Sequence, residues 1–129
     1  MASALMKYPR YFTSAVLQDA IFDLPSYLFS NYSERNIDLF GDVKDKQVYE
    51  FCKTYSPYQM EIPKTLKNVL VTSTTNDPTV TQTRKFIARL RTHFKGTTNN
   101  ELIFYKEFEP DVTDIYRFAV EFSFLMKNY

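Results

Sequence analysis

Three β-prone segments alternate with helical segments along this chain, and this alternation limits the possible folds more than any other feature. The segments 13–20, 68–72 and 101–106 have the composition of strands, and helical spacing follows each of them. The apolar run Val69-Leu70-Val71 is typical of a strand that is covered on both faces. We therefore predict an α/β fold in three layers, with a short, mainly parallel sheet of about three strands flanked by helices.

Helix-ending residues and apolar spacing place the remaining elements within one domain, residues 1–129. We expect a helical turn over 1–7, because Pro9 bars its continuation. The region 21–31 is expected to hold a loop and a short helix, and 31–44 a connection around Gly41. The other expected elements are helices at 45–55, 81–95 and 110–127 and a turn at 96–100.

Charge and cysteine content exclude several classes of protein. Sixteen Lys and Arg against 15 Asp and Glu argue against a nucleic-acid-coating protein, but they permit a local basic face. Cys52 is the single cysteine, so it forms no internal disulfide and fits a reducing compartment; we expect it to be semi-buried on a helix. No metal-ligand cluster lies near it, and neither a metal nor a cofactor is expected.

Two further features bear on location. No apolar run approaches the roughly 20 residues that a membrane-spanning helix needs. Residues 1–18 carry Lys7 and Arg10 without an acid, as a mitochondrial presequence would, although Pro9 interrupts them. The expected location is intracellular and cytoplasmic, with mitochondrial import as the alternative.

Glycine is scarce, and this weighs against several kinds of active site. Gly41 and Gly96 are the only two glycines, against a usual frequency of about 7%. Phosphate-binding loops, nucleophile elbows and backbone oxyanion holes use glycine for tight turns and close approach. The chain is therefore poorly equipped for any of them.

Four stretches together resemble the prolyl oligopeptidase family, most closely its oligopeptidase B branch. They occur in the family's order and cover about residues 5–125. The stretches are 16–24 (VLQDAIFDL), 53–58 (KTYSPY), 69–72 (VLVT) and 85–90 (KFIARL). The resemblance implies the final third of an α/β-hydrolase domain, and hence a truncated, degenerate α/β-hydrolase-like remnant.

The family's catalytic serine lies in a Gly-x-Ser-x-Gly-Gly elbow ahead of a proline that Pro9 matches. Counting back from Pro9 runs past Met1, and Ser3 has no flanking glycines. By the resemblance, Asp77 corresponds to the catalytic acid. The family's catalytic histidine would lie between the last strand and the last helix, where 104–110 instead crosses directly.

The only histidine, His93, falls at the end of the preceding helix, which places it near the opposite end of the strands from Asp77. In a catalytic triad the imidazole accepts the serine proton and the acid orients the imidazole. Without serine or histidine, Asp77 has nothing to orient. We therefore expect no functional catalytic residue, and interpret Asp77 as a relict kept as a turn or helix-capping group.

The helix expected at 81–95 has an apolar side and a basic side. Its apolar side carries Phe86, Ile87, Leu90 and Phe94. The cations spread over the other side, where they form either a solvated face or a contact surface for RNA phosphate or an acidic partner. They are Arg84, Lys85, Arg89, Arg91 and Lys95.

The last helix has more apolar surface than one sheet face needs. The stripe expected to face inward comprises Ile115, Phe118, Ala119, Phe122 and Met126. A second line, formed by Tyr116, Val120 and Phe124, is expected to contact another subunit. The strand near Val16 and Leu17 is likewise expected to have an open edge that pairs with another protein chain.

These observations predict a non-catalytic remnant of a serine peptidase that serves as a structural or interaction subunit of a larger assembly. One alternative is half of a split hydrolase whose serine and histidine come from another chain. A second alternative is a lineage-specific RNA-associated component, ribosomal or mitoribosomal, that uses the basic helix.

Overall fold

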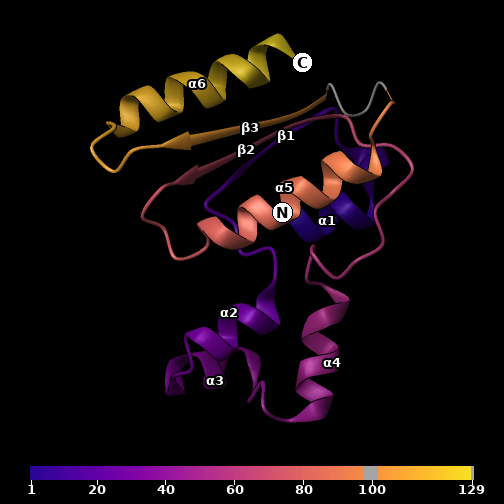
Figure 1. Cartoon of the computed structure of the whole chain (residues 1–129), viewed down its shortest axis with the longest axis vertical. Coiled ribbons are helices and arrows are strands. Elements are labelled where there is room, and N and C mark those ends of the chain that lie inside the picture. Colours follow the sequence, from indigo (N-terminus) through magenta and orange to yellow (C-terminus); the bar gives the residue numbers. More distant parts are fainter. Residues whose placement is uncertain (98–101, 129) are drawn as a thin grey trace.

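A parallel sheet of three strands lies at the centre of the computed structural model, which describes residues 1–97 and 102–128 (Figure 1). The strands are β1 (Ser14–Gln18), β2 (Asn68–Thr74) and β3 (Ile103–Phe108), in the order β1-β2-β3. Leu70 in β2 lies opposite Val16 on one side and Phe104 on the other. This sheet, with helices on both faces, confirms the predicted α/β fold.

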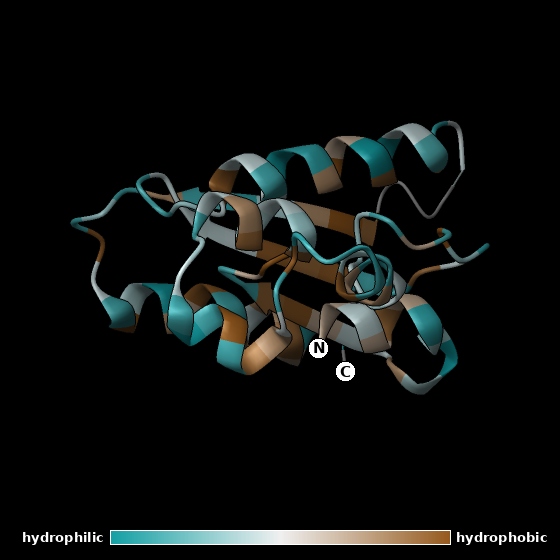
Figure 2. Cartoon of the chain, turned by 90° about the horizontal axis from the view of Figure 1, so that it is seen from below, coloured by the Kyte–Doolittle hydropathy of each residue, from teal (hydrophilic) through white to brown (hydrophobic). Residues whose placement is uncertain are grey.

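The main core lies on one face of the sheet. Because strand side chains alternate between faces, Ala15, Leu17 and Val71 project into this core, whereas Val16 and Leu70 project to the opposite face. Helices α1 (Ala2–Lys7) and α5 (Val80–His93) cover the core side, and α6 (Asp114–Lys127) covers the other (Figure 1). Figure 2 shows the hydrophobic strand residues gathered between these layers.

The apolar side predicted for the 81–95 helix is the side that packs. Phe86, Ile87, Leu90 and Phe94 are all buried in the main core. Phe86 stacks on Phe22, with ring centroids 4.3 Å apart. The expected helical turn at the amino end is also present as α1, followed by a short 3-10 helix, η1 (Pro9–Tyr11).

Three short helices form a separate lobe beside the sheet (Figure 1). They are α2 (Leu24–Ser30), α3 (Glu34–Phe40) and α4 (Lys46–Thr54). Leu24, Leu28, Val43 and Cys52 form their own apolar cluster, in which Cys52 is fully buried rather than semi-buried. The lobe is joined to the sheet layer by buried Ser56, whose hydroxyl accepts from the Leu24 N–H (2.9 Å) and donates to the Phe22 carbonyl (3.1 Å).

Two predictions of helix position were wrong. The expected connection at 31–44 contains α3, whose start is capped by the Ser33 hydroxyl and whose end is marked by Gly41 at φ +84°. The last helix begins at Asp114 rather than Pro110, because Thr113 caps it by accepting from the Tyr116 N–H. The turn expected at 96–100 lies mostly outside the described residues.

The predicted orientation of the last helix was also wrong. Its supposed inward stripe faces solvent: Ile115, Phe118, Phe122 and Met126 are 65–82% exposed. The residues turned toward the sheet are instead Arg117, Val120, Glu121 and Phe124. The helix is rotated about its axis relative to the prediction, because polar side chains on the sheet, described below, bind Arg117 and Glu121.

Candidate functional site at the carboxyl ends of the strands

Asp77 lies in the turn that follows β2, where it organises the backbone. Its Oδ1 accepts a hydrogen bond from the Thr79 N–H (2.7 Å) and another from the Thr79 hydroxyl. Both donors belong to the turn itself, two residues further along the chain. This arrangement is the turn-forming role of an aspartate that the sequence predicts.

The connection from β3 to α6 passes beside this turn. It runs from Glu109 to Thr113 and contains no histidine. Glu109 accepts a hydrogen bond from the Thr75 hydroxyl (3.1 Å), and the Thr75 N–H donates to the Phe108 carbonyl (2.9 Å). The space next to the Asp77 turn is therefore crossed by a short, hydrogen-bonded connection.

The only histidine lies far from Asp77. His93 is the last residue of α5, a helix of 14 residues that starts near the Asp77 turn. At 1.5 Å per residue this separates the two by about 20 Å. His93 is exposed, and its ring meets the edge of Phe94. The Ser3 hydroxyl is engaged elsewhere, because it donates a hydrogen bond to the Tyr55 carbonyl.

A polar cluster beneath α6 is the part of this edge that the sequence analysis missed. Asp19 follows β1 with φ +40°, and its carboxylate accepts from the Thr74 N–H (2.9 Å) and from Arg117 (2.7 Å). Arg117 also donates to the Thr74 hydroxyl (2.9 Å). Glu121, 7% exposed, accepts from the Thr72 hydroxyl at 2.7 Å.

These contacts leave part of the cluster unpaired, since Arg117 Nε is buried and has no hydrogen-bond partner among the described residues. Arg117 pairs with Asp19, and Glu121 has a neutral hydroxyl donor. The sign that could have revealed the cluster is the i, i+4 spacing of Arg117 and Glu121, which places both on one side of a helix. Their sheet partners are more than 40 residues away and have no sequence signature.

The basic helix is only partly free to bind a ligand. Arg84 forms two hydrogen bonds of 2.7 Å with Glu107, and these bonds, with a further one from Tyr105, lower the pKa of Glu107 to about 2. Arg89 donates to the Met60 carbonyl (2.8 Å). Within the described chain, Lys85, Arg91 and Lys95 are exposed and have no hydrogen-bond or ion-pair partner.

The predicted interface residues are divided between surface and interior. Leu17 is 2% exposed and belongs to the core, so it offers no contact surface. Val120 and Phe124 are half-buried against the sheet, where Phe124 meets the edge of Phe104. Val16 is half-buried at the edge of the sheet, and only Tyr116 is exposed. In the described residues β1 pairs with β2 alone, so its outer edge is open.

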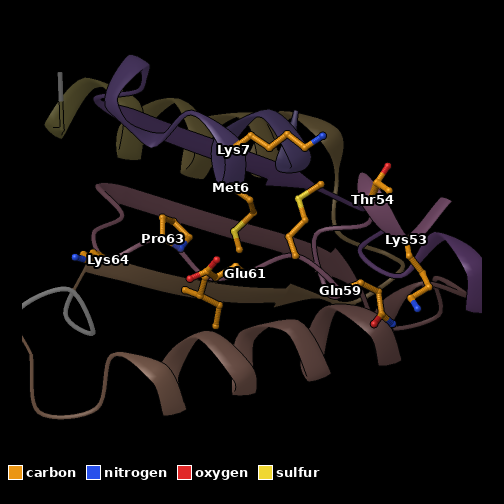
Figure 3. Close-up of a pocket in the computed structure, with 10 residues that line it drawn as sticks. Met6, Lys7, Lys53, Thr54, Gln59, Glu61, Pro63 and Lys64 are labelled. Carbon is orange, nitrogen blue, oxygen red and sulfur yellow. The ribbon is translucent and has the colours of Figure 1, made fainter. Parts of the chain in front are cut away.

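A hollow of about 540 Å³ is lined by other residues, among them Met60, whose carbonyl accepts the hydrogen bond from Arg89 (Figure 3). Figure 3 shows Met6 and Lys7 above the segment that carries Glu61 and Pro63. The hollow is wide open to solvent, and none of the predicted site residues lines it. The described residues contain no cluster of three or more metal-ligating side chains. Among them, no helix combines the length and apolar character that crossing a membrane requires.

Comparisons with known proteins identify the parent fold. The sequence profile described as the prolyl oligopeptidase family matches residues 1–123. A solved structure from a mechanistic study of two prolyl endopeptidases superimposes with a TM-score of 0.78 and 21% sequence identity. The match covers 98% of this chain but only 18% of that protein. No curated protein matches the sequence.

Proposed function

The chain belongs to the prolyl oligopeptidase family, and we propose that it is a non-catalytic member that acts as a structural or interaction subunit of a larger assembly. The observation that carries this proposal is the connection from β3 to α6. It contains no histidine, and His93 lies at the other end of α5 from Asp77. Since that connection is internal to the chain, the lack of a histidine in it does not depend on where the sequence begins.

Two surface features support the interaction role. The outer edge of β1 has no partner strand in the described chain, and unpaired strand edges readily bind other chains. The exposed stripe on α6 is an apolar surface of a kind that water-exposed helices rarely carry. Both features are consistent with contacts to another polypeptide.

Activity-based labelling tests the non-catalytic part of the proposal. The purified full chain is incubated with a fluorophosphonate probe and, separately, with a proline-containing peptide substrate, with an active prolyl endopeptidase as positive control. We expect neither labelling nor hydrolysis. Covalent labelling of a serine in this chain, or turnover that follows the protein through purification, would refute the proposal.

A split hydrolase is the second candidate function. The observation that favours it is the position of Asp77, which lies after the carboxyl end of β2 as the family's catalytic acid does. It requires a partner chain that supplies both the serine elbow and the histidine. Purification of the tagged protein from its native cells, with mass spectrometry, decides the question: a stoichiometric partner with both groups supports the split enzyme.

An RNA-associated role is the third candidate, and it would use Lys85, Arg91 and Lys95. These cations remain exposed on α5, whereas Arg84 and Arg89 are bound within the molecule. Three cations give a weaker phosphate-binding surface than the five that the sequence suggested. This reduced charge makes RNA binding the least supported of the three roles.

A further inference from the structure

The hollow opens between the end of α1, the end of α4 and the segment 59–64 (Figure 3). Its apolar lining comes from Met6, Met60, Ile62 and Pro63. Met6, Met60 and Ile62 also belong to the main core, so the hollow is an opening onto the core from the α1 side of the sheet. Its volume of about 540 Å³ falls within the range of roughly 300–1,000 Å³ that is usual for ligand sites.

Positive charge surrounds the hollow. Lys7, Lys53 and Lys64 line it, and Glu61 is the only acid among its described lining residues. Lys53 forms an ion pair with Glu50. Lys7 and Lys64 are exposed, and within the described chain they have no hydrogen-bond or ion-pair partner. Two lysines at the rim are therefore available to bind an anion.

The charge continues beyond the hollow along the amino ends of β1 and β2. These two strands pair in parallel, so the segments that precede them lie side by side. Arg10 precedes β1, Lys67 precedes β2, and both are exposed. Residues 1–14 contain no acid, and residues 56–68 contain only Glu61. This part of the surface therefore has a positive potential that attracts acidic groups.

The segment that lines the hollow also presents main-chain groups. Residues 61–63 belong to no helix or strand. Among the described residues, the N–H groups of Glu61, Ile62 and Lys64 have no main-chain hydrogen-bond partner. A polypeptide that lies along such a segment can pair with its main chain, whereas a hydrocarbon chain cannot.

We propose that the hollow is a docking site for an acidic peptide segment of a partner protein, in which one large apolar side chain lies between aspartates or glutamates. The apolar side chain packs on Met6, Met60 and Ile62, and the flexible methionines adapt to its shape. The neighbouring carboxylates bind Lys7 and Lys64. This inference rests on the proposed interaction role and deepens it by naming the chemistry of the partner.

The lining of the hollow favours a peptide over RNA. Single-stranded nucleic acids bind largely by stacking their bases on aromatic rings, and none of the described lining residues is aromatic. An aliphatic or aromatic side chain of a peptide packs on methionine and isoleucine without needing a ring. Because the hollow is wide open to solvent, it admits a chain that enters at one side and leaves at the other.

Titration with defined peptides tests the proposal. The probe is a short fluorescent peptide of Asp and Glu with one central Phe, and the comparison peptide has Ser in place of Phe. Fluorescence anisotropy with the purified full chain is expected to give a dissociation constant below about 100 µM for the Phe peptide. The Ser peptide should bind about 10-fold more weakly or worse, because its apolar anchor is lost. Changing the peptide leaves the fold of the protein untouched.

Charge reversal on the protein tests the two lysines. Lys7→Glu combined with Lys64→Glu should weaken binding of the Phe peptide about 10-fold or more, because two attractions become repulsions. The matched control is Lys44→Glu combined with Lys46→Glu. It makes the same change in net charge at exposed positions at and before the start of α4, away from the hollow. The control should leave the dissociation constant within about 2-fold of the parent value.

The native methionines report where the peptide binds. In a chain isotopically labelled in its methionine methyl groups, the nuclear magnetic resonance signals of Met6 and Met60 should shift during the titration. Met126 is the internal control, because it is exposed on α6, which covers the opposite face of the sheet. Its signal should not move.

Each outcome decides the proposal. A dissociation constant above about 1 mM, equal losses in the two double variants, or unmoved Met6 and Met60 signals would overturn it. Tighter binding of a single-stranded uridine oligonucleotide, with shifts of the same two signals, would also overturn it.

The fluorophosphonate experiment separates this inference from the proposed function. Failure of peptide docking in a chain that remains unlabelled would leave the non-catalytic interaction role standing. Labelling of a serine in a chain that still binds the Phe peptide would refute the non-catalytic role and leave the docking site standing.

Discussion

Arg117 on α6 donates a 2.7 Å hydrogen bond to the carboxylate of Asp19, which follows β1 and lies 98 residues earlier in the chain. The ion pair is largely shielded from water, with side-chain exposures of 13% and 25%. It joins the last helix to the first strand. It also explains why this side of α6, rather than its more apolar side, faces the sheet.

Arg117→Ala is expected to lower the free energy of unfolding by about 1–3 kcal/mol, because Asp19 loses a charged partner in a partly dry environment. Urea denaturation followed by circular dichroism measures the change. Lys53→Ala is the control, since Lys53 forms an exposed ion pair with Glu50 and its loss should cost less than about 0.5 kcal/mol. Equal effects of the two substitutions would contradict a special role for Arg117.

Asp77 supports a turn, so its acceptor oxygen should matter more than its charge. Asp77→Ala is expected to cost about 1 kcal/mol of unfolding free energy through the lost hydrogen bonds to Thr79. Asp77→Asn keeps an acceptor oxygen and should remain within about 0.5 kcal/mol of the parent. If the asparagine variant were as unstable as the alanine variant, the carboxylate charge would be the feature that the fold requires.

The Arg84–Glu107 pair makes stability depend on pH in a defined window. Arg84 and Tyr105 lower the pKa of Glu107 to about 2, whereas a glutamate carboxyl group in an unfolded chain has a pKa of about 4.3. The depressed pKa means that the pair stabilises the fold above about pH 4.3 and loses this effect as pH falls through about 2. The parent chain should melt at a higher temperature than Glu107→Gln at neutral pH, and this difference in melting temperature should shrink as the pH falls across this window. An advantage that stayed constant from pH 6 to about pH 2 would contradict the assignment.

The exposed cations of α5 lie across the sheet from α6 and its exposed apolar side chains, so a protein that binds α6 should not need them. The triple variant Lys85→Glu, Arg91→Glu, Lys95→Glu is expected to recover the same protein partners as the parent chain. Its unfolding free energy should change by no more than about 0.5 kcal/mol for each substitution. RNA that co-purifies with the parent and is lost from the triple variant would instead favour the RNA-associated role.

Most elements followed from local sequence, but the side of α6 that faces the sheet did not. The apolar spacing of Phe86, Ile87 and Leu90 identified the buried side of α5, because its sheet face is apolar. The same rule failed for α6, where the sheet presents Asp19, Thr72 and Thr74. Polar partners on distant strands turned Arg117 and Glu121 inward. The i, i+4 spacing of these two residues places them on one side of the helix but does not reveal their partners.

The site at the carboxyl ends of the strands was predictable only in its outline. Spacing and the family resemblance placed Asp77 after β2 and His93 at the far end of α5, as the structure shows. The contacts of Arg84 and Arg89 were not foreseeable, since Glu107 and Met60 come from a different strand and loop. The missed helix α3 had local signs, namely the cap at Ser33 and the left-handed Gly41.

The separate apolar cluster of α2, α3 and α4 implies that the molecule does not unfold as one cooperative unit. The lobe shares little packing with the sheet, and Ser56 provides the buried hydrogen bonds at its base. Amide hydrogens in the lobe should therefore exchange with solvent through partial opening, while those of β2 exchange only when the whole chain unfolds. The lobe could thus change shape in response to a bound partner while the sheet stays intact.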